Sequence, residues 1–191
     1  MSGAAQVAHI TLAKPGERVN GDAVFVRRDG ADRLVLAVID GLGHGPIAAE
    51  ASQAAVACLA SAGLERSVLE LMQMMHAELR GTRGAAATVC VIRGAKLETC
   101  AVGNVQLSSS ATMVPLVLSS GVLGQRVAKF RVCEAELKSG TRLALFSDGI
   151  SSRLRLEEMR RLVPEQACKQ VIEQHRKLED DATILIADMD G

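Results

Sequence analysis

Aspartates at the ends of apolar segments are the residues of this chain whose type and spacing could do chemistry. Asp22 precedes a β-rich segment, Asp40 and Asp148 each follow an apolar one, and Asp180-Asp181 precede the last apolar run. These positions have no surrounding cluster of Cys and His. Carboxylates combined with backbone carbonyls and water form the oxygen-rich kind of site that suits Mg²⁺ or Mn²⁺. We therefore expect a hard-cation site where these acids meet in the fold.

The separation of Asp22 and Asp40 predicts that they face each other. Segments 23–28 and 33–39 are β-rich, and the turn-forming sequence Asp29-Gly30-Ala31-Asp32 separates them. Antiparallel pairing around that turn places residue 22 opposite residue 40. Directly opposed residues bring their Cβ atoms to about 4.5–5.5 Å, and two carboxylates about 4 Å apart repel by roughly 4 kcal/mol at an effective dielectric near 20. A shared proton, a basic side chain or a divalent cation would each offset this repulsion.

The segment Asp40-Gly41-Leu42-Gly43-His44-Gly45 could serve a cation and an anion together. Its glycines let the backbone approach a ligand closely, and a carbonyl such as that of Gly41 can ligate a cation. The N-terminus of the helix predicted from Pro46 onward favours an anion such as phosphate. Taken alone, the stretch is equally consistent with an ordinary Gly-rich turn. Four other acids are interpreted as turn residues without a functional role: Asp29, Asp32, Asp188 and Asp190.

The elements that must position these acids follow from hydrophobic periodicity. Strands are predicted at 7–13, 23–28, 33–39, 87–93, 96–102, 105–109, 114–118, 130–137, 142–146 and 182–187. Helices are predicted from Pro46 to Ala62, in a second segment capped by Ser67, and near 156–162 and 164–177. The run 34–39 is apolar at every position, which indicates a strand covered on both faces. This order predicts an α/β (α+β) fold of two mostly antiparallel sheets flanked by helix pairs.

Length and composition favour one domain, residues 1–191, and exclude several classes of function. The 22 basic residues balance the 22 acidic ones, and only three aromatics occur. We therefore expect no nucleic-acid binding and no polybasic membrane contact. Five scattered cysteines without a CxxC pair predict buried thiols rather than disulfides or a zinc site. The lack of a signal-peptide pattern and of a long apolar run predicts a cytoplasmic protein.

With these residues in place, the chain resembles the metal-dependent (PPM-type) serine/threonine protein phosphatases, and most of all their small bacterial SpoIIE/RsbX-like branch. The resemblance spans nearly the whole chain in family order. It rests on segments 20–23, 40–45, 84–88, 102–105, 121–124, 137–150 and 180–183. The family's fold, a four-layer α-β-β-α sandwich, agrees with the predicted order of elements.

The resemblance implies two bound Mn²⁺ or Mg²⁺ ions and a role for each acid. Asp40 would bridge both ions, and the Gly41 carbonyl would ligate one. Asp148 and Asp180 would complete the sphere of one ion, while Asp22 would serve the other, directly or through water. Asp22, Asp40, Asp148 and Asp180 are thus the expected catalytic residues. A metal-activated water would hydrolyse phosphoserine or phosphothreonine without a covalent enzyme intermediate.

Some features depart from the family pattern. The larger family often has a phosphate-gripping arginine five residues before the acid equivalent to Asp22, whereas Arg18 lies four before it. His44 follows the bridging acid by four residues rather than two, so it is expected to shape the loop at least as readily as to protonate a leaving group. Asp181, where the family has Asn or Asp, is expected to orient its neighbours. The segment between Asp148 and Asp180 is too short for a large flap, which points to a docked folded protein as the substrate.

The leading hypothesis is a phosphatase of a stress-response or partner-switching pathway. Its substrate would be a phosphorylated regulatory protein of the STAS-domain or anti-sigma-antagonist type. The alternative is a catalytically silent phosphoprotein-binding module on the same scaffold, and the acid at every expected ligand position argues against it. A third possibility, nucleotide binding through the Gly-rich segment, is disfavoured because the chain lacks the GxxxxGK[ST] and GxGxxG motifs. Ser147 and Ser151 lack the His and acid partners of a nucleophilic triad, and the sequence makes no prediction about oligomeric state.

Overall fold

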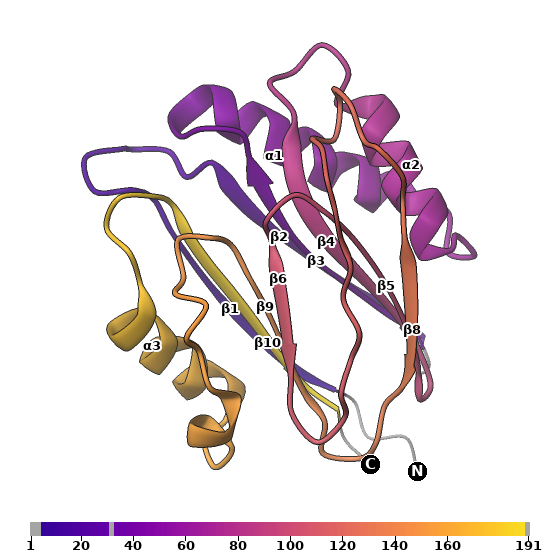
Figure 1. Ribbon diagram of the computed structural model, residues 1–191, viewed down its shortest axis with the longest axis vertical. Coiled ribbons are helices and arrows are strands. Elements are labelled where there is room, and N and C mark those ends of the chain that lie inside the picture. Colours follow the sequence, from indigo (N-terminus) through magenta and orange to yellow (C-terminus); the bar gives the residue numbers. More distant parts are fainter. Residues whose placement is uncertain (1–4, 31–32, 190–191) are drawn as a thin grey trace.

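Two β-sheets face each other and carry helices on their outer surfaces in the computed structural model, which describes residues 5–30 and 33–189 (Figure 1). The helices are α1 (Gly45–Ser61), α2 (Val68–Glu78) and α3 (Pro164–His175), with a 3₁₀ turn η1 (Leu156–Met159). The strands are β1 (Gln6–Leu12), β2 (Asp22–Asp29), β3 (Arg33–Gly41), β4 (Ala85–Arg93), β5 (Lys96–Val102), β6 (Gln106–Ser109), β7 (Leu118–Ser119), β8 (Val132–Glu136), β9 (Arg142–Phe146) and β10 (Ala182–Asp188).

The two sheets have different strand orders and different helical covers. One sheet has the order β1-β10-β9-β6, and α3 contacts its strands β1 and β10. The other has the order β2-β3-β4-β5-β7, with β8 also paired to β5, and α1 and α2 pack against it. All pairings are antiparallel except that of β5 with β7. The predicted sandwich of two mostly antiparallel sheets is therefore confirmed.

Alternation along β3 explains how one apolar strand serves two cores. Leu34, Leu36 and Val38 belong to the core between the sheets, whereas the intervening side chains belong to the core under α1 and α2. Successive side chains of a strand point to opposite faces, so a strand buried on both faces must be apolar at every position. The prediction made from the run 34–39 is confirmed.

Helix α2 begins as predicted from its capping residue. The Ser67 hydroxyl accepts a hydrogen bond from the Glu70 backbone N–H, and the Glu70 side chain accepts one from the Ser67 backbone N–H. This reciprocal capping box satisfies two N–H groups that the helix itself cannot pair.

Two predicted elements are wrong. Segment 114–118 is not a strand, and only Leu118 of it pairs, within the two-residue β7. Pro115 lacks the N–H that a strand interior requires. The helix predicted near 156–162 is reduced to the single turn η1, which ends shortly before the proline that starts α3. The residue before a proline is disfavoured in the helical region, so the two helical segments cannot merge.

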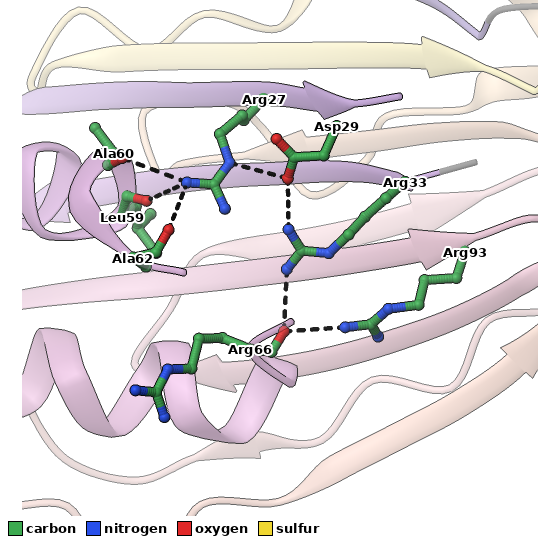
Figure 2. Close-up of polar contacts among 8 residues, drawn as sticks. All are labelled: Arg27, Asp29, Arg33, Leu59, Ala60, Ala62, Arg66 and Arg93. Carbon is green, nitrogen blue, oxygen red and sulfur yellow. Dashed lines mark hydrogen bonds and ion pairs between the residues drawn. The ribbon is translucent and has the colours of Figure 1, made fainter. Parts of the chain in front are cut away.

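An arginine cluster closes the end of the β2–β3 pair that is distant from Asp22 and Asp40 (Figure 2). Asp29 Oδ2 accepts hydrogen bonds from Arg27 Nε at 3.1 Å and from Arg33 Nη1 at 2.6 Å. Arg27 Nη1 also donates to carbonyls at the C-terminus of α1, and Arg33 and Arg93 both donate to the carbonyl of Arg66. The cluster thus connects the sheet to the C-terminus of α1 and to Arg66, which lies just before α2.

The remaining acids interpreted as turn residues have structural partners where the structure describes them. The Asp188 carboxylate pairs with Arg142 at 2.6 Å, and Arg142 also donates to the carbonyls of Met159 and Leu162. Asp32 and Asp190 lie outside the described residues. All five cysteines are free and four of them are buried, as predicted. Within residues 5–30 and 33–189, no helix is both long and apolar enough to cross a membrane.

Candidate active site

The β2–β3 pair brings two aspartates face to face. Asp22 is the direct partner of Asp40, as the turn between the two segments predicted. Both acids lie on the face directed at the other sheet, because Val24 and Val38, two residues away, contribute to the core between the sheets. Asp22 is only 5% exposed, and its Oδ2 accepts a hydrogen bond of 2.6 Å from the Ser147 hydroxyl.

The other sheet supplies two more aspartates to this place. Asp148 lies just after β9 and Asp180 just before β10, and these strands are neighbours. Together with Asp40 they line a cavity of about 420 Å³. Three of the four predicted catalytic acids, from three separate segments, therefore share one cavity. Asp22 does not line it and lies buried beside Asp40.

Two glycines allow the loops that carry these acids to pack closely. A Cβ at Gly41 would lie 2.0 Å from the carbonyl oxygen of Ala48 in α1. A Cβ at Gly149 would lie 1.9 Å from the carbonyl oxygen of Asp181. Any side chain at either position would therefore push apart the backbone that positions the neighbouring acid.

Burial and mutual repulsion disfavour the charged forms of these carboxyls. Burial raises the pKa of Asp40 to about 8, and the negative charges of Asp22, Asp148 and Asp180 add to the effect. Burial also raises the pKa of Asp22 to about 7, while the hydrogen bond from Ser147 acts in the opposite direction. No basic side chain forms an ion pair with Asp22 or Asp40 in the part of the chain that the structure describes. Of the three ways to offset the repulsion, a proton or a cation remains.

Asp148 is held from two sides. Burial, followed by the charge of Asp180, raises the pKa of Asp148, and Lys177 and a hydrogen bond from Asn104 act to lower it. Asn104 Nδ2 donates to Asp148 Oδ2 at 2.6 Å, and Lys177 Nζ donates to the backbone carbonyl of Asp148 at 2.6 Å. The loop after β5 therefore orients the carboxylate through Asn104, and the segment after α3 holds the backbone of Asp148 through Lys177.

The donor set fits hard divalent cations. Buried carboxylates without basic partners gain charge compensation from such an ion, and oxygen ligands are those that Mg²⁺ and Mn²⁺ prefer. No three Asp, Glu, His or Cys side chains converge tightly enough to enclose one ion within the described residues. Mg²⁺ commonly uses one or two carboxylates and keeps several waters, so water and the Gly41 carbonyl would complete the ligand sets.

The structure places the three residues that depart from the family pattern. Arg18 is exposed and is not among the residues that line the cavity. His44 lines the cavity, and its Nδ1 lies 2.7 Å from Glu17 Oε1. This contact connects segment 40–45 to the β1–β2 loop. His44 makes no side-chain cap of α1. Asp181 is buried and accepts backbone hydrogen bonds, a structural role consistent with orienting its neighbours.

Sequence reasoning missed four residues of the site. Ser147 was considered only as a nucleophile, yet its buried hydroxyl donates to Asp22 and accepts from the Thr183 N–H at 3.0 Å. Asn104 and Lys177 hold Asp148, and Lys14 lines the cavity. The family motifs were the available signals, because segments 102–105 and 137–150 contain Asn104 and Ser147, whereas partners so far apart in sequence leave no mark in spacing.

Solved structures share this arrangement of two facing sheets with helices on their outer surfaces. A crystal structure of RsbX in complex with magnesium has the same fold, with a TM-score of 0.85 over 97% of this chain and 95% of that one, at 23% identity. A protein solved in a study of the bacterial stressosome, a modular system adapted to control secondary messenger signaling, has a TM-score of 0.90 at 30% identity, over 97% and 100% of the two chains.

The chain belongs to the SpoIIE family. It matches the family described as Stage II sporulation protein E (SpoIIE) over residues 30–190. It is also 30% identical over 146 residues to the phosphoserine phosphatase RsbX of Bacillus subtilis (strain 168), which covers 73% of this chain and 72% of that protein. The resemblance identified from the motifs is confirmed.

Proposed function

We propose that this chain is a metal-dependent phosphoprotein phosphatase that removes phosphate from phosphoserine or phosphothreonine of a regulatory partner protein. One observation carries the proposal: Asp40, Asp148 and Asp180 line one cavity, next to buried Asp22, and no basic side chain among residues 5–30 and 33–189 forms an ion pair with Asp22 or Asp40. Membership of the SpoIIE family and the likeness to a phosphoserine phosphatase support the reaction.

In this proposal the chain's own residues hold and orient two divalent ions, Mn²⁺ or Mg²⁺. Asp40 would hold both ions from the β2–β3 pair and the Gly41 carbonyl would hold one of them. Asp148 and Asp180 would hold one ion from the other sheet, and Asp22 would serve the other, directly or through water. When bound, such ions neutralise phosphate oxygens and activate a water molecule as the nucleophile. Positioning and charge neutralisation then supply most of the lowering of the barrier.

Hydrogen bonds from neighbouring residues keep the proposed metal ligands in place. Ser147 fixes the Asp22 carboxylate and is itself fixed by the backbone of β10, while Asn104 fixes Asp148. Such outer hydrogen bonds orient metal ligands and tune their affinity. The hydroxyl of Ser147 is buried and engaged, which supports a mechanism without a serine nucleophile.

Hydrolysis of p-nitrophenyl phosphate tests the reaction. The protein is assayed with Mn²⁺, with excess EDTA, and as the Asp40→Asn variant. Turnover that depends on Mn²⁺ and is lost in EDTA and in the variant supports the proposal. Turnover that survives chelation contradicts it.

The substrate is proposed to be a phosphorylated regulator of a stress-response pathway, of the STAS-domain or anti-sigma-antagonist type. The likeness to RsbX and to a stressosome-related structure supports this class. The protein is incubated with phosphorylated candidate regulators and loss of phosphate is followed by mass. Tight binding of a phosphoprotein with no loss of phosphate would favour the binding-module alternative instead. We further propose that residues 1–191 act as a single cytoplasmic catalytic domain.

A further inference from the structure

Lys14 is a basic residue at the acid-lined cavity. It follows β1, at the start of the β1–β2 loop, and it is half-buried. It lines the same cavity as Asp40, Asp148 and Asp180. Its position close to the proposed reaction centre therefore calls for a role.

Asp181 fixes both ends of the loop that carries Lys14. Its Oδ1 accepts a hydrogen bond from the Lys14 backbone N–H at 2.8 Å, and its Oδ2 accepts one from the Gly21 backbone N–H at 2.9 Å. An asparagine offers one acceptor oxygen and would direct its NH₂ group at the other N–H. The aspartate at this position is thus the residue that can hold Lys14 and Gly21 at once.

The Lys14 ammonium has no anionic partner within the described ranges. No carboxylate there lies within 4.0 Å of it, although Asp40, Glu179 and Asp180 line the same cavity. The neighbouring basic groups are engaged differently, since Lys177 donates to a backbone carbonyl and His44 pairs with Glu17. Lys14 therefore retains its hydrogen-bonding capacity for a ligand of the cavity.

We propose that Lys14 binds an oxygen of the substrate's phosphoryl group, with Asp181 as the positioning residue that holds its backbone. This inference rests on the proposed function and assigns the phosphate contact to Lys14 rather than to Arg18. A phosphoryl dianion that enters an acid-lined cavity needs positive charge in addition to the charge that neutralises the acids. Lysine can supply it, because its ammonium group binds phosphate as a point charge. Arg18, four residues further along the same loop, is exposed and does not line the cavity.

Two measurements on three variants test the assignment. Lys14→Ala, Lys14→Arg and the matched control Arg18→Ala are assayed with p-nitrophenyl phosphate and Mn²⁺, and binding of inorganic phosphate is measured by calorimetry in Mn²⁺. Loss of one charge-assisted contact is expected to raise KM and the Kd for phosphate by about tenfold in Lys14→Ala, with a smaller change in kcat. Lys14→Arg is expected to restore most of the affinity, and Arg18→Ala to match the unmodified protein.

Opposite results overturn the assignment. These are unchanged phosphate affinity in Lys14→Ala, a phosphate defect that appears in Arg18→Ala instead, or tighter Mn²⁺ binding in Lys14→Ala with phosphate binding intact. The last result would make Lys14 a counter-charge for the acids. If the unmodified protein binds phosphate through Lys14 but hydrolyses nothing, the proposed function fails and the assignment of Lys14 stands.

A double-mutant cycle tests the positioning role of Asp181. Asp181→Asn is expected to weaken phosphate binding by less than Lys14→Ala does, because the lysine is retained but its backbone is released. In the Lys14→Ala background, Asp181→Asn is expected to cause little further loss, since both changes act on the same contact. Full additivity of the two losses would show that Asp181 acts on phosphate binding independently of Lys14, and would refute the positioning role.

Discussion

Asp29 at one end of the β2–β3 pair has two arginine partners, whereas Asp22 and Asp40 at the other end face each other with no basic partner among the described residues. The two ends belong to the same pair of strands and are both largely shielded from water. One end has the charge compensation that a buried carboxylate requires for stability. The other end has no such compensation within the described residues, and carboxyls with pKa values raised in this way cluster at functional sites.

The difference separates two uses of the same residue type. At the arginine end, Arg27 and Arg33 neutralise the Asp29 carboxylate within the chain, and Arg27 also donates a hydrogen bond to the end of α1. At the aspartate end the carboxylates have no compensating charge from the described residues, and the proposed cations would supply it. Changes at the two ends are therefore expected to act on different properties.

The largest effect is expected from Asp40→Asn. Removing the carboxylate proposed to serve both ions should lower the rate of p-nitrophenyl phosphate hydrolysis by about 10³-fold in Mn²⁺. The fold in EDTA should be at least as stable as that of the unmodified protein, because one of two repelling charges is gone. A variant that keeps a tenth of the activity, or that unfolds, would remove the basis for the comparison.

At the opposite end, Arg33→Met should reduce stability and spare the chemistry. It leaves Asp29 with one arginine and the Arg66 carbonyl with one fewer donor. We expect a loss of about 2–3 kcal/mol in the free energy of unfolding, measured in urea. Activity per folded molecule should stay unchanged. Arg66→Ala removes only an exposed ion pair with Glu70 and serves as the control, with little change expected in the free energy of unfolding.

The pH dependence of stability should report the aspartate end alone. The pKa values of Asp22 and Asp40, about 7 and about 8, are higher than those of the same groups in an unfolded chain. A carboxyl of this kind stabilises the fold at low pH, and that contribution is lost as the pH rises through its folded value. In EDTA, the thermal midpoint should therefore fall as the pH rises from about 4, near the ordinary pKa of an aspartate, to about 8, and then level off. Saturating Mg²⁺ should flatten or reverse this slope, and an equal slope with and without Mg²⁺ would contradict the metal assignment.

The smallest effect is expected from Asn104→Ala. The exposed amide donates to Asp148, so its loss should free that carboxylate without disturbing the core. The Mn²⁺ concentration for half-maximal activity should rise by about tenfold, in line with other outer-sphere contacts of metal ligands. Stability in EDTA should not change. An unchanged requirement for Mn²⁺ would show that the contact does not orient a ligand.

Local rules were sufficient for the parts of the fold that depend on neighbours in sequence. The turn between 29 and 33 and the period of two fixed the pairing of Asp22 with Asp40, and the capping residue Ser67 located the start of α2. The family motifs then indicated that Asp148 and Asp180 belong with them, and both line the cavity with Asp40.

Contacts across the two sheets were beyond such rules. The hydrogen bond from Ser147 to Asp22 and the support of Lys14 by Asp181 depend on how distant segments pack. Asp29 is a different case, because its partners Arg27 and Arg33 lie in the same hairpin and were within reach of a local prediction. The wrong prediction of a strand at 114–118 has a local cause, because the apolar residues around Pro115 are typical of a strand but the proline has no N–H to pair.

The edge position of β2 makes the geometry of the reaction centre sensitive to a remote hairpin. Among the described strands, β2 lies at the edge of its sheet, so its register depends on β3 and on the hairpin that joins them. A shift by one residue would turn Asp22 to the helical side, although that hairpin lies roughly 23 Å away along the strand. An insertion or deletion there that slips the register by one residue would therefore separate the Asp22 and Asp40 carboxylates while leaving most of the architecture intact.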